Sequence, residues 1–524
     1  MSLFARKNYS ISLGAVIALL AVNVSAGVDY TNPVVPGDHP DPSIIRVGDD
    51  YWATCTSSAW GPLFPLLHSR DLVNWEQTGA VLRHRPEWAT GDFWAPEISE
   101  FHGKYFVYFV ARQHNRRLSV AVATADKPGG PYTSHDPIIA QADGSIDPAP
   151  VVDTNGVRYL VWKEDGNSQQ KPTPIWLQRL NDDGTKLIGE PHELIHNDAD
   201  WEGNVVEGPF ILRRGDWFYL FYSGAGCCGT GCNYALGVAR SHSLSGPWEK
   251  NPANPILAAN ETWKCPGHGS IVQDPAGRYF LLYHSYAANN SIYTGRQGML
   301  DEVTFGADDW PMINQRKGPS VHAISPEGAI QNVTAGGLTN NFDGKNLDSG
   351  WQWPQQREPN YHVANGALYL SPSRTSTNYV AAILARSTTA ANYVATTEIE
   401  PAALKPGAAA GICAFGNMEN ALGLVWQDAN IIVWRRDNGE ARELWKQPFP
   451  KAEKMFLRLT ATEGYHFQLA ASTNGETWIP CGDAADSKKL PPWDCSVRVA
   501  LTAGGIAGAE AVFDSFAMRS LEKP

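Results

Sequence analysis

The sequence predicts an all-β protein with two domains, a five-bladed β-propeller followed by an antiparallel β-sandwich. The propeller prediction rests on one phrase that recurs five times in the first 300 residues: an opener, a few strand-forming residues, a turn and an aromatic-rich strand. The openers are separated by 54, 52, 60 and 61 residues, a period typical of propeller blades. They are Asp41, Ala95, Asp147, Glu207 and His268.

The chain length and a change of pattern place the domain boundaries. A chain of 524 residues exceeds what one hydrophobic core usually supports, so two domains are expected. We place the propeller at residues 27–318, a linker rich in Gly, Ala, Pro and Ser at 319–340, and the sandwich at 341–524. After residue 341, alternating strands are joined by turns such as Asp437-Asn-Gly, which indicates an antiparallel sandwich.

The first 26 residues have the pattern of a cleaved signal peptide. Arg6 and Lys7 precede an apolar run, 11–24, and small residues precede Gly27. We therefore expect a secreted or periplasmic protein whose mature chain begins at about Gly27. Removing two positive charges changes the formal net charge from −12 to −14. An acidic chain without a basic run or a long apolar segment predicts no nucleic-acid or membrane partner, and it favours a neutral substrate.

Four of the eight cysteines gather around a glycine-rich stretch, and we expect disulfides there. Cys227, Cys228, Cys232 and Cys265 lack the paired CxxC spacing of a structural zinc site. Adjacent Cα atoms lie about 3.8 Å apart, below the usual disulfide range, so one of the first two is expected to bond to Cys232 or Cys265. The stretch also lacks the Gly-Lys-Ser/Thr ending of a phosphate loop. We expect it to form a disulfide-pinned loop at the rim of a pocket.

The other four cysteines lead to two further predictions. Cys481 and Cys495 flank a short polar excursion and are expected to form a hairpin disulfide. Cys55 and Cys413 have no evident partner in the sequence and are expected to be buried thiols.

Three of the five openers, Asp41, Asp147 and Glu207, are carboxylic acids. Because equivalent positions of different blades meet around the central axis, we expect the three carboxyls at the bottom of one funnel. A single Asp-Pro pair more often caps a turn. Three acids at one phase of a repeat favour an acid/base enzyme instead.

Several motifs in this order resemble glycoside hydrolase family 43. They are Asp41-Pro-Ser, Ser69-Arg-Asp-Leu-Val-Asn-Trp75, Trp94-Ala-Pro-Glu97, Ser145-Ile-Asp-Pro148, Val206-Glu-Gly-Pro209 and Pro266-Gly-His-Gly269. The resemblance covers about residues 33–315 and implies a propeller that hydrolyses arabinose- or xylose-containing plant polysaccharides with inversion. The region that begins with Phe342-Asp-Gly is similar to the jelly-roll, concanavalin A-like sandwich of the family's β-xylosidases.

The resemblance also implies roles for the acids. Asp41 would be the general base and Glu207 the general acid, and Asp147 would orient the acid and raise its pKa. Inversion needs two carboxyls about 6.5–9.5 Å apart on opposite sides of the sugar. Like charges in a confined site would keep Glu207 protonated near neutral pH.

His268 occupies the fifth opener without a carboxyl group. In the family this histidine lies on the propeller axis, often among the water ligands of a calcium ion. Calcium prefers several oxygen ligands and the sequence has no loop of dense acids, so a structural Ca²⁺ held through water and a histidine bonded only to backbone both stay open. No cofactor is expected to be required.

Aromatic side chains and one arginine are candidates for sugar binding. Trp94 stands beside an opener, and Phe93 and Trp60 are weaker candidates of the same kind. Arg296 matches a family arginine that holds a sugar hydroxyl near the acid, with a surface salt bridge as the alternative.

The sandwich allows three roles: a lid, a polysaccharide anchor or a stability module. We expect a packed accessory domain that lends an aromatic side chain to the pocket, with Trp351 and Trp353 as candidates.

Together these features predict a secreted, inverting, exo-acting α-L-arabinofuranosidase. β-Xylosidase or bifunctional xylosidase/arabinofuranosidase activity is the nearest alternative, followed by endo-arabinanase. The alternative from a different class is a carbohydrate-binding protein without catalysis. A retaining enzyme of the invertase type is disfavoured, because Asp147-Pro148 follows Ile146 where that type has Arg. Oligomeric state is not indicated.

Overall fold

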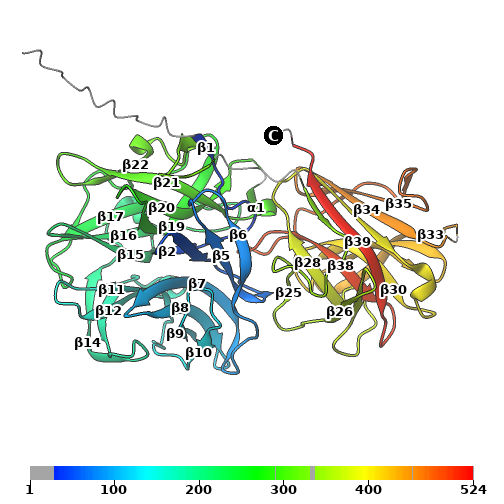
Figure 1. The fold of residues 1–524 in the computed structure, drawn as a ribbon, viewed down its shortest axis with the longest axis horizontal. Helices are drawn as coiled ribbons and strands as arrows, with labels where there is room; N and C mark the ends of the chain where they lie inside the picture. The colour runs from blue at the N-terminus through cyan, green and yellow to red at the C-terminus, as the bar shows by residue number, and fades with distance from the viewer. Residues whose placement is uncertain (1–28, 290, 331–336, 451, 523–524) are drawn as a thin grey trace, which may run out of the picture.

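The computed structural model describes residues 29–289, 291–330, 337–450 and 452–522. The predicted signal peptide, 1–26, lies outside these ranges. Figure 1 shows two lobes side by side, an N-terminal lobe coloured blue to green and a C-terminal lobe coloured yellow to red. Nearly all regular structure is β, as predicted, and the only α-helix among the described residues is α1 (Ser291–Thr294). Within those residues, no helix has the length and hydropathy of a membrane span.

The N-terminal lobe is a five-bladed propeller, which confirms the predicted fold. Each blade is a four-stranded antiparallel sheet whose strands follow one another in chain order. The strands, blade by blade, are β2 (Ser43–Val47), β3 (Asp50–Thr54), β5 (Leu63–Ser69) and β6 (Glu76–Leu82); β7 (Ala89–Phe101), β8 (Lys104–Gln113), β9 (Leu118–Ala125) and β10 (Thr133–Ser134); β11 (Ser145–Val152), β12 (Arg158–Glu164), β13 (Ile175–Leu180) and β14 (Leu187–Ile195); β15 (Val206–Arg214), β16 (Trp217–Gly224), β17 (Ala235–Ser241) and β18 (Glu249–Lys250); β19 (Trp263–Gln273), β20 (Tyr279–Ala287), β21 (Gln297–Phe305) and β22 (Pro311–Ile313).

The innermost strands of the blades form a closed ring. β2, β7, β11, β15 and β19 contact one another in this order, and β19 contacts β2. The N-terminal segment, which precedes the first blade, is hydrogen-bonded to β21 of the fifth blade. The Tyr30 hydroxyl donates to the Leu300 carbonyl at 2.5 Å, and Asn32 Nδ2 donates to the same oxygen at 2.9 Å. β1 (Asp29–Thr31) also pairs with β23 (His322–Ile324). The predicted linker, 319–340, is therefore not wholly irregular, because it contains β23, which pairs with β1 at the start of the propeller.

The C-terminal lobe is a sandwich of two antiparallel sheets, as predicted. The larger sheet orders its strands β26-β27-β39-β29-β34-β35-β36, with β24 added to β39 and β37 to β35, and the smaller sheet orders them β28-β38-β30-β31-β32-β33. Their bounds are β24 (Leu338–Asn340), β26 (Asn360–Ala364), β27 (Ala367–Ser371), β28 (Ala382–Ser387), β29 (Tyr393–Ile399), β30 (Ala409–Phe415), β31 (Ala421–Gln427), β32 (Asn430–Asp437), β33 (Glu440–Pro448), β34 (Met455–Thr462), β35 (His466–Ser472), β36 (Ile479–Pro480), β37 (Ala485–Asp486), β38 (Arg498–Gly504) and β39 (Ala511–Ser520). β24 lies inside the predicted linker, so the sandwich begins earlier than residue 341.

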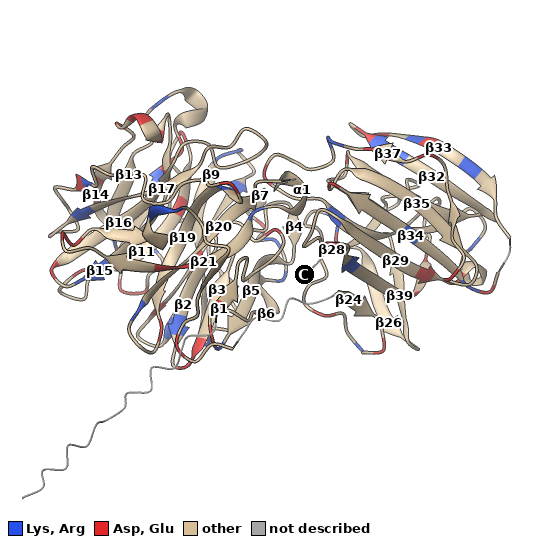
Figure 2. Ribbon diagram, turned by 90° about the horizontal axis from the view of Figure 1, so that it is seen from above, with Lys and Arg blue, Asp and Glu red and all other residues tan. Residues whose placement is uncertain are grey.

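The two lobes are joined by direct pairing as well as by the chain. β4 (Trp60–Gly61) of the propeller pairs with β25 (Trp353–Pro354) of the sandwich. Figure 2 shows the lobes from above, with acidic and basic segments interspersed over both. The paired strands bring the sandwich close to the mouth of the propeller, where the site described below lies.

Candidate active site

A backbone irregularity recurs once per blade at the centre of the propeller. One residue on or beside each inner strand has a positive φ: Asp41 (51°), Ala95 (44°), Asp147 (55°), Gly208 (59°) and His268 (44°). The strand pairing shifts register around the last four of these positions, which is typical of bulges that redirect a side chain. In the fourth blade the irregular residue is Gly208. Glu207 therefore lies one residue before the position that Asp41 and Asp147 occupy in their own blades. The prediction that all three acids share one phase of the repeat is wrong in this detail.

Gly208 is needed where it stands. A Cβ there would lie 2.9 Å from His268 Cγ, and the backbone already has a conformation that side chains disfavour. The glycine lets the fourth and fifth blades approach each other beside Glu207.

The three acids converge in one cavity of about 850 Å³. Asp41, Asp147 and Glu207 line it, together with the predicted residues Trp94, His268 and Arg296. The propeller fold thus brings carboxyls from the first, third and fourth blades into a single cavity. This arrangement is what hydrolysis by paired carboxyls requires.

Asp41 is held as an anion by side chains of the first and fifth blades. Its Oδ2 accepts from Thr56 Oγ1 at 2.6 Å, and its Oδ1 accepts from Arg296 Nη1 at 2.9 Å. His268 Nδ1 lies 3.5 Å from the same Oδ1. Burial alone would raise the pKa of Asp41, but the electrostatic contribution of Arg296 and the nearby His268 holds that pKa well below its usual range. An ionised Asp41 suits the role of a base.

His284 was not predicted and completes the support of Asp41. This ring is fully buried, and the backbone N–H of Asp41 donates to its Nδ1 at 3.1 Å. Burial lowers the pKa of His284 to about 4, so the ring is neutral and can accept that bond. The signal in the sequence was a histidine within the apolar strand Phe280-Leu-Leu-Tyr-His284.

Lys163 is a second residue that sequence reasoning missed, and it faces the predicted acid. Its Nζ lies 2.8 Å from Glu207 Oε2 and 2.9 Å from Asp165 Oδ1, and its side chain is 1% exposed. A lysine within the apolar strand Tyr159-Leu-Val-Trp-Lys163 was the available signal, because a buried cation needs an anionic partner.

Asp147 and Glu207 interact electrostatically, and their surroundings shift the two pKa values in opposite directions. Asp147 Oδ2 accepts from the backbone N–H of Gly208 at 2.9 Å. Burial, together with the nearby Glu207 carboxylate, raises the pKa of Asp147 to about 7. Burial also acts to raise the pKa of Glu207, but Lys163 outweighs it and the pKa falls below the ordinary value. In the substrate-free site the proton therefore resides on Asp147, contrary to the expectation that Asp147 keeps Glu207 protonated.

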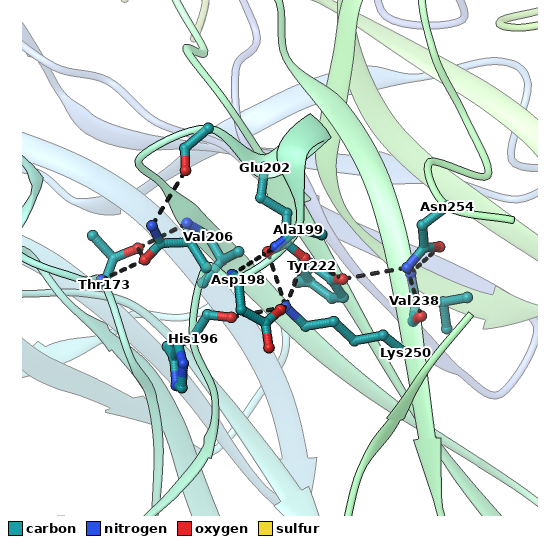
Figure 3. Close-up of polar contacts among 12 residues, drawn as sticks. Thr173, His196, Asp198, Ala199, Glu202, Val206, Tyr222, Val238, Lys250 and Asn254 are labelled. Atoms are coloured by element: carbon teal, nitrogen blue, oxygen red, sulfur yellow. Dashed lines mark hydrogen bonds and ion pairs between the residues drawn. The ribbon is translucent and has the colours of Figure 1, made fainter. Parts of the chain in front are cut away.

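A buried ionic network fixes the loop that leads to Glu207 (Figure 3). Glu202 is fully buried; its Oε1 accepts from the Tyr222 hydroxyl at 2.7 Å and from Lys250 Nζ at 2.7 Å. Its Oε2 accepts from two backbone N–H groups of the same loop, those of residues 198 and 199. Every oxygen of this buried carboxylate is thus paired, as burial requires.

The residue next to Glu207 is anchored separately. The backbone N–H of Val206 donates to Thr173 Oγ1 at 2.8 Å, as Figure 3 also shows. β15 therefore starts from a fixed point on the neighbouring blade, and the backbone of Glu207 has little freedom to move.

The sandwich contributes to the same cavity. Trp493 and Asp494 line it, and the Trp493 ring meets that of Trp94 edge to face at 6.1 Å. Arg296 Nη2 donates to the Asp494 carbonyl at 3.4 Å. Arg296 is 4% exposed, so the alternative of a surface salt bridge is wrong.

The predicted aromatic residues divide into two groups. Trp94 reaches the cavity, whereas Phe93 is fully buried between blades, where its ring meets that of Phe64. Trp60 is buried against the sandwich, where it contacts Phe415 and lies beneath Arg498. The predictions that Phe93 and Trp60 bind sugar are therefore wrong, because neither ring faces the cavity.

The candidates from the sandwich are corrected in the same way. Trp351 and Trp353 are 2% and 3% exposed and pack in the core of the sandwich. The aromatic residue that the sandwich places at the cavity is Trp493, which is 62% exposed. Composition could not distinguish it from the other tryptophans.

The disulfides differ from the predicted pairs. Cys232 bonds to Cys265, with Cα atoms 6.0 Å apart, and the adjacent Cys227 and Cys228 bond to each other. The expectation that one of the adjacent pair would take Cys232 or Cys265 is wrong, because those two already face each other across the loop.

The remaining cysteines are all buried thiols. This confirms the predictions for Cys55 and Cys413. The predicted bond between Cys481 and Cys495 is wrong, because the first packs in the core between the two sheets and the second packs against the propeller side.

His268 lines the cavity with the three acids, and its Nδ1 lies 3.5 Å from Asp41 Oδ1. Among the described residues, no group of three or more His, Cys, Asp or Glu side chains is placed to hold a metal ion. The calcium ion predicted near His268 would be held through water, so it stays a prediction, and no step below involves a metal.

Comparison with known proteins identifies the family of this chain. Residues 30–311 match the family model described as glycosyl hydrolases family 43, and residues 339–496 match the β-xylosidase C-terminal concanavalin A-like domain. A protein named Xylosidase/arabinosidase 43B from Humicola insolens is 31% identical, over 56% of this chain and 57% of that protein. A Xylan 1,3-beta-xylosidase from a Vibrio species is 26% identical, over 88% and 91%.

Among solved structures, the family 43 protein BlXynB from Bacillus licheniformis aligns with a TM-score of 0.81 at 26% identity. The alignment covers 94% of this chain and all of that one. The family model spans more than half of this chain, and Asp41, Asp147 and Glu207 share one cavity. The chain therefore belongs to glycosyl hydrolase family 43, as an enzyme that carries the family's concanavalin A-like C-terminal domain.

Proposed function

We propose that the protein is a secreted, inverting exo-glycosidase that releases terminal pentose units, preferentially α-L-arabinofuranose, from neutral plant oligosaccharides or polysaccharides. Asp41 activates the attacking water, and Glu207 protonates the departing oxygen. Asp147 orients the segment of Glu207 through the Gly208 N–H and interacts electrostatically with Glu207. The observation that carries the proposal is the convergence of Asp41, Asp147 and Glu207 in one cavity.

Exo action is supported by the mouth of the cavity. The exposed Trp493 ring from the sandwich meets Trp94 of the propeller and narrows the opening on that side. A narrowed opening favours the end of a chain over its interior. One relative, from Cellvibrio japonicus, is named an extracellular exo-α-(1→5)-L-arabinofuranosidase, and it is 28% identical over 60% of this chain.

β-Xylosidase activity is the second candidate, and a specific observation favours it. The relative that matches both domains, from the Vibrio species, is named as a xylosidase. The sandwich also matches a domain model named after β-xylosidases.

A paired assay separates these candidates and tests the mechanism. Aryl α-L-arabinofuranoside and aryl β-D-xylopyranoside are compared by kcat/KM, and the anomer of the first-formed product is followed by NMR. We expect the arabinofuranoside to be preferred by about tenfold, a discrimination of the size that pocket shape provides. We also expect inverted product. A retained anomer would refute the mechanism, and a preference for the xylopyranoside would establish the second candidate.

The surroundings of Glu207 predict opposite pH shifts in two variants. Lys163→Met removes the cation that stabilises the Glu207 anion, so the pKa of Glu207 rises. The basic limb of the kcat/KM profile should then move up by about one pH unit. Asp147→Asn removes the carboxylate charge beside Glu207, so the pKa of Glu207 falls. The basic limb of the kcat/KM profile should then move to lower pH.

The measurement is the pH dependence of kcat/KM with a pentose disaccharide, because its leaving sugar must be protonated. In both variants the acidic limb should stay below the ordinary aspartate value of 3.8, because the partners of Asp41 are unchanged. Lys186→Met, at an exposed lysine beside β14, serves as the control. Shifts of the same sign in the two variants would contradict this account of the proton.

A further inference from the structure

The loop that follows β16 carries a disulfide between neighbouring residues at the edge of the cavity. Glu207 on β15 pairs with Ser223 on β16, and Val206 pairs with Gly224. The chain then turns at Ala225, whose φ is 67°, and reaches Cys227 and Cys228. Both cysteines are bonded to each other and line the same cavity as Glu207.

This loop is held firmly in place. Gly226 N–H donates to Asn233 Oδ1 at 2.9 Å, and Asn233 N–H donates to the Gly226 carbonyl at 3.0 Å, which closes the base of the loop. The Cys232–Cys265 bond ties the loop to β19 of the next blade. The Cys227–Cys228 bond is therefore not required to anchor the loop, and another reason is needed for its presence.

The composition of the loop leaves the disulfide uncovered. Gly226, Gly229 and Gly231 have no side chains, and Thr230 is exposed and does not line the cavity. The part of the loop that faces the cavity is its backbone and the disulfide itself. A disulfide carries no charge and no strong hydrogen-bond donor, and its sulfur atoms are polarisable. It offers a small, rigid, apolar surface against which the C–H face of a sugar can pack.

We propose that the Cys227–Cys228 disulfide is the apolar wall of the subsite that receives the leaving group. A general acid protonates the oxygen that departs, so the leaving sugar must lie on the Glu207 side of the cleaved bond. The disulfide follows the strand that pairs directly with Glu207, whereas the edge-to-face contact of Trp94 and Trp493 involves neither cysteine. This assignment rests on the proposed function, because it takes Glu207 as the acid.

The test compares substrates that differ only in the leaving group. A pentosyl fluoride has no leaving sugar, whereas the corresponding pentose disaccharide places one in the proposed subsite. In Cys227→Ala/Cys228→Ala, kcat/KM for the disaccharide should fall about tenfold, the lower range for an apolar contact in a binding pocket. The value for the fluoride should stay within about twofold of that of the wild type.

Two controls use the same loop. Thr230→Ala changes an exposed side chain away from the cavity and should leave both substrates unaffected. Cys232→Ala/Cys265→Ala removes the anchor but keeps the adjacent pair, so any loss through loop mobility appears there. Peptide mapping of the wild-type enzyme under non-reducing conditions checks the pairing.

The outcomes separate the inference from the function it rests on. Equal losses on both substrates, no loss on the disaccharide, or a mapped bond from Cys227 or Cys228 to another cysteine would overturn the subsite. Should the double variant fail to fold, the folded wild-type enzyme is reduced with a phosphine and alkylated, and the same selective loss is expected. A wild-type enzyme that cleaves neither substrate would refute the proposed function and the subsite with it.

Discussion

Glu207→Gln is expected to lower kcat on a pentose disaccharide by about 10²- to 10⁴-fold, the contribution typical of a general acid. The substitution keeps the shape of the side chain and removes its proton. The affinity for the sugar should change little, because the cavity-lining residues Trp94, His268 and Arg296 are untouched. Turnover kinetics and calorimetric titration with the disaccharide measure the two quantities separately. A carbohydrate-binding protein without catalysis would have no turnover to lose.

The leaving group distinguishes the acid from the base. An aryl leaving group of low pKa departs without protonation, so Glu207→Gln should retain most of its activity on such a substrate. Asp41→Asn should instead lose a similar factor on every substrate, because water must be activated in each case. Glu190→Gln, at an exposed residue of β14, is the matched control and should behave as the wild type. Losses in Glu207→Gln that do not depend on the leaving group would reject Glu207 as the acid.

Arg498→Met is expected to destabilise the protein by about 3–5 kcal/mol, the cost of leaving one charge of a buried pair without its partner. Arg498 Nη1 of the sandwich lies 3.1 Å from Asp38 Oδ2 of the propeller, and both side chains are 3% exposed. Apparent melting temperature and urea unfolding report the loss. In Arg498→Met/Asp38→Asn the buried charge is gone, so part of the stability should return.

The same variant should also lose activity at temperatures where it remains folded. Asp38 Oδ1 accepts from the backbone N–H of Arg296 at 3.2 Å, and the Arg296 side chain holds Asp41. The sandwich is thus connected to the predicted base through Asp38 and Arg296. We expect kcat to fall more than the affinity for the sugar.

Arg442→Met provides the comparison for Arg498→Met. Arg442 forms an exposed ion pair with Asp437 on the sandwich, and such pairs contribute at most about 1 kcal/mol. If Arg442→Met and Arg498→Met had equal effects on stability, the buried pair would not join the lobes as described.

The site was only partly predictable because its support comes from several blades. Asp41, Asp147 and Glu207 were found through the repeat, but Lys163 and His284 lie on second strands of their blades and carry no motif. The repeat also predicted that Glu207 occupies the same position in its blade as Asp41 and Asp147, but the residue with a positive φ in that blade is Gly208. Phe93 stands beside Trp94 in sequence, yet neighbouring residues of a strand point to opposite sides, and Phe93 enters the core.

The sequence by itself determined the all-β class, the five blades and the convergence of the three acids, because blade period and strand alternation are properties of the chain. Tertiary structure alone decided which cations reach the acids, which cysteines meet and which tryptophan of the sandwich approaches the cavity. These depend on distances between segments far apart in the chain. Lys163 shows the consequence: a lone lysine in an apolar strand has no visible function until folding places it 2.8 Å from Glu207 and changes where the proton resides.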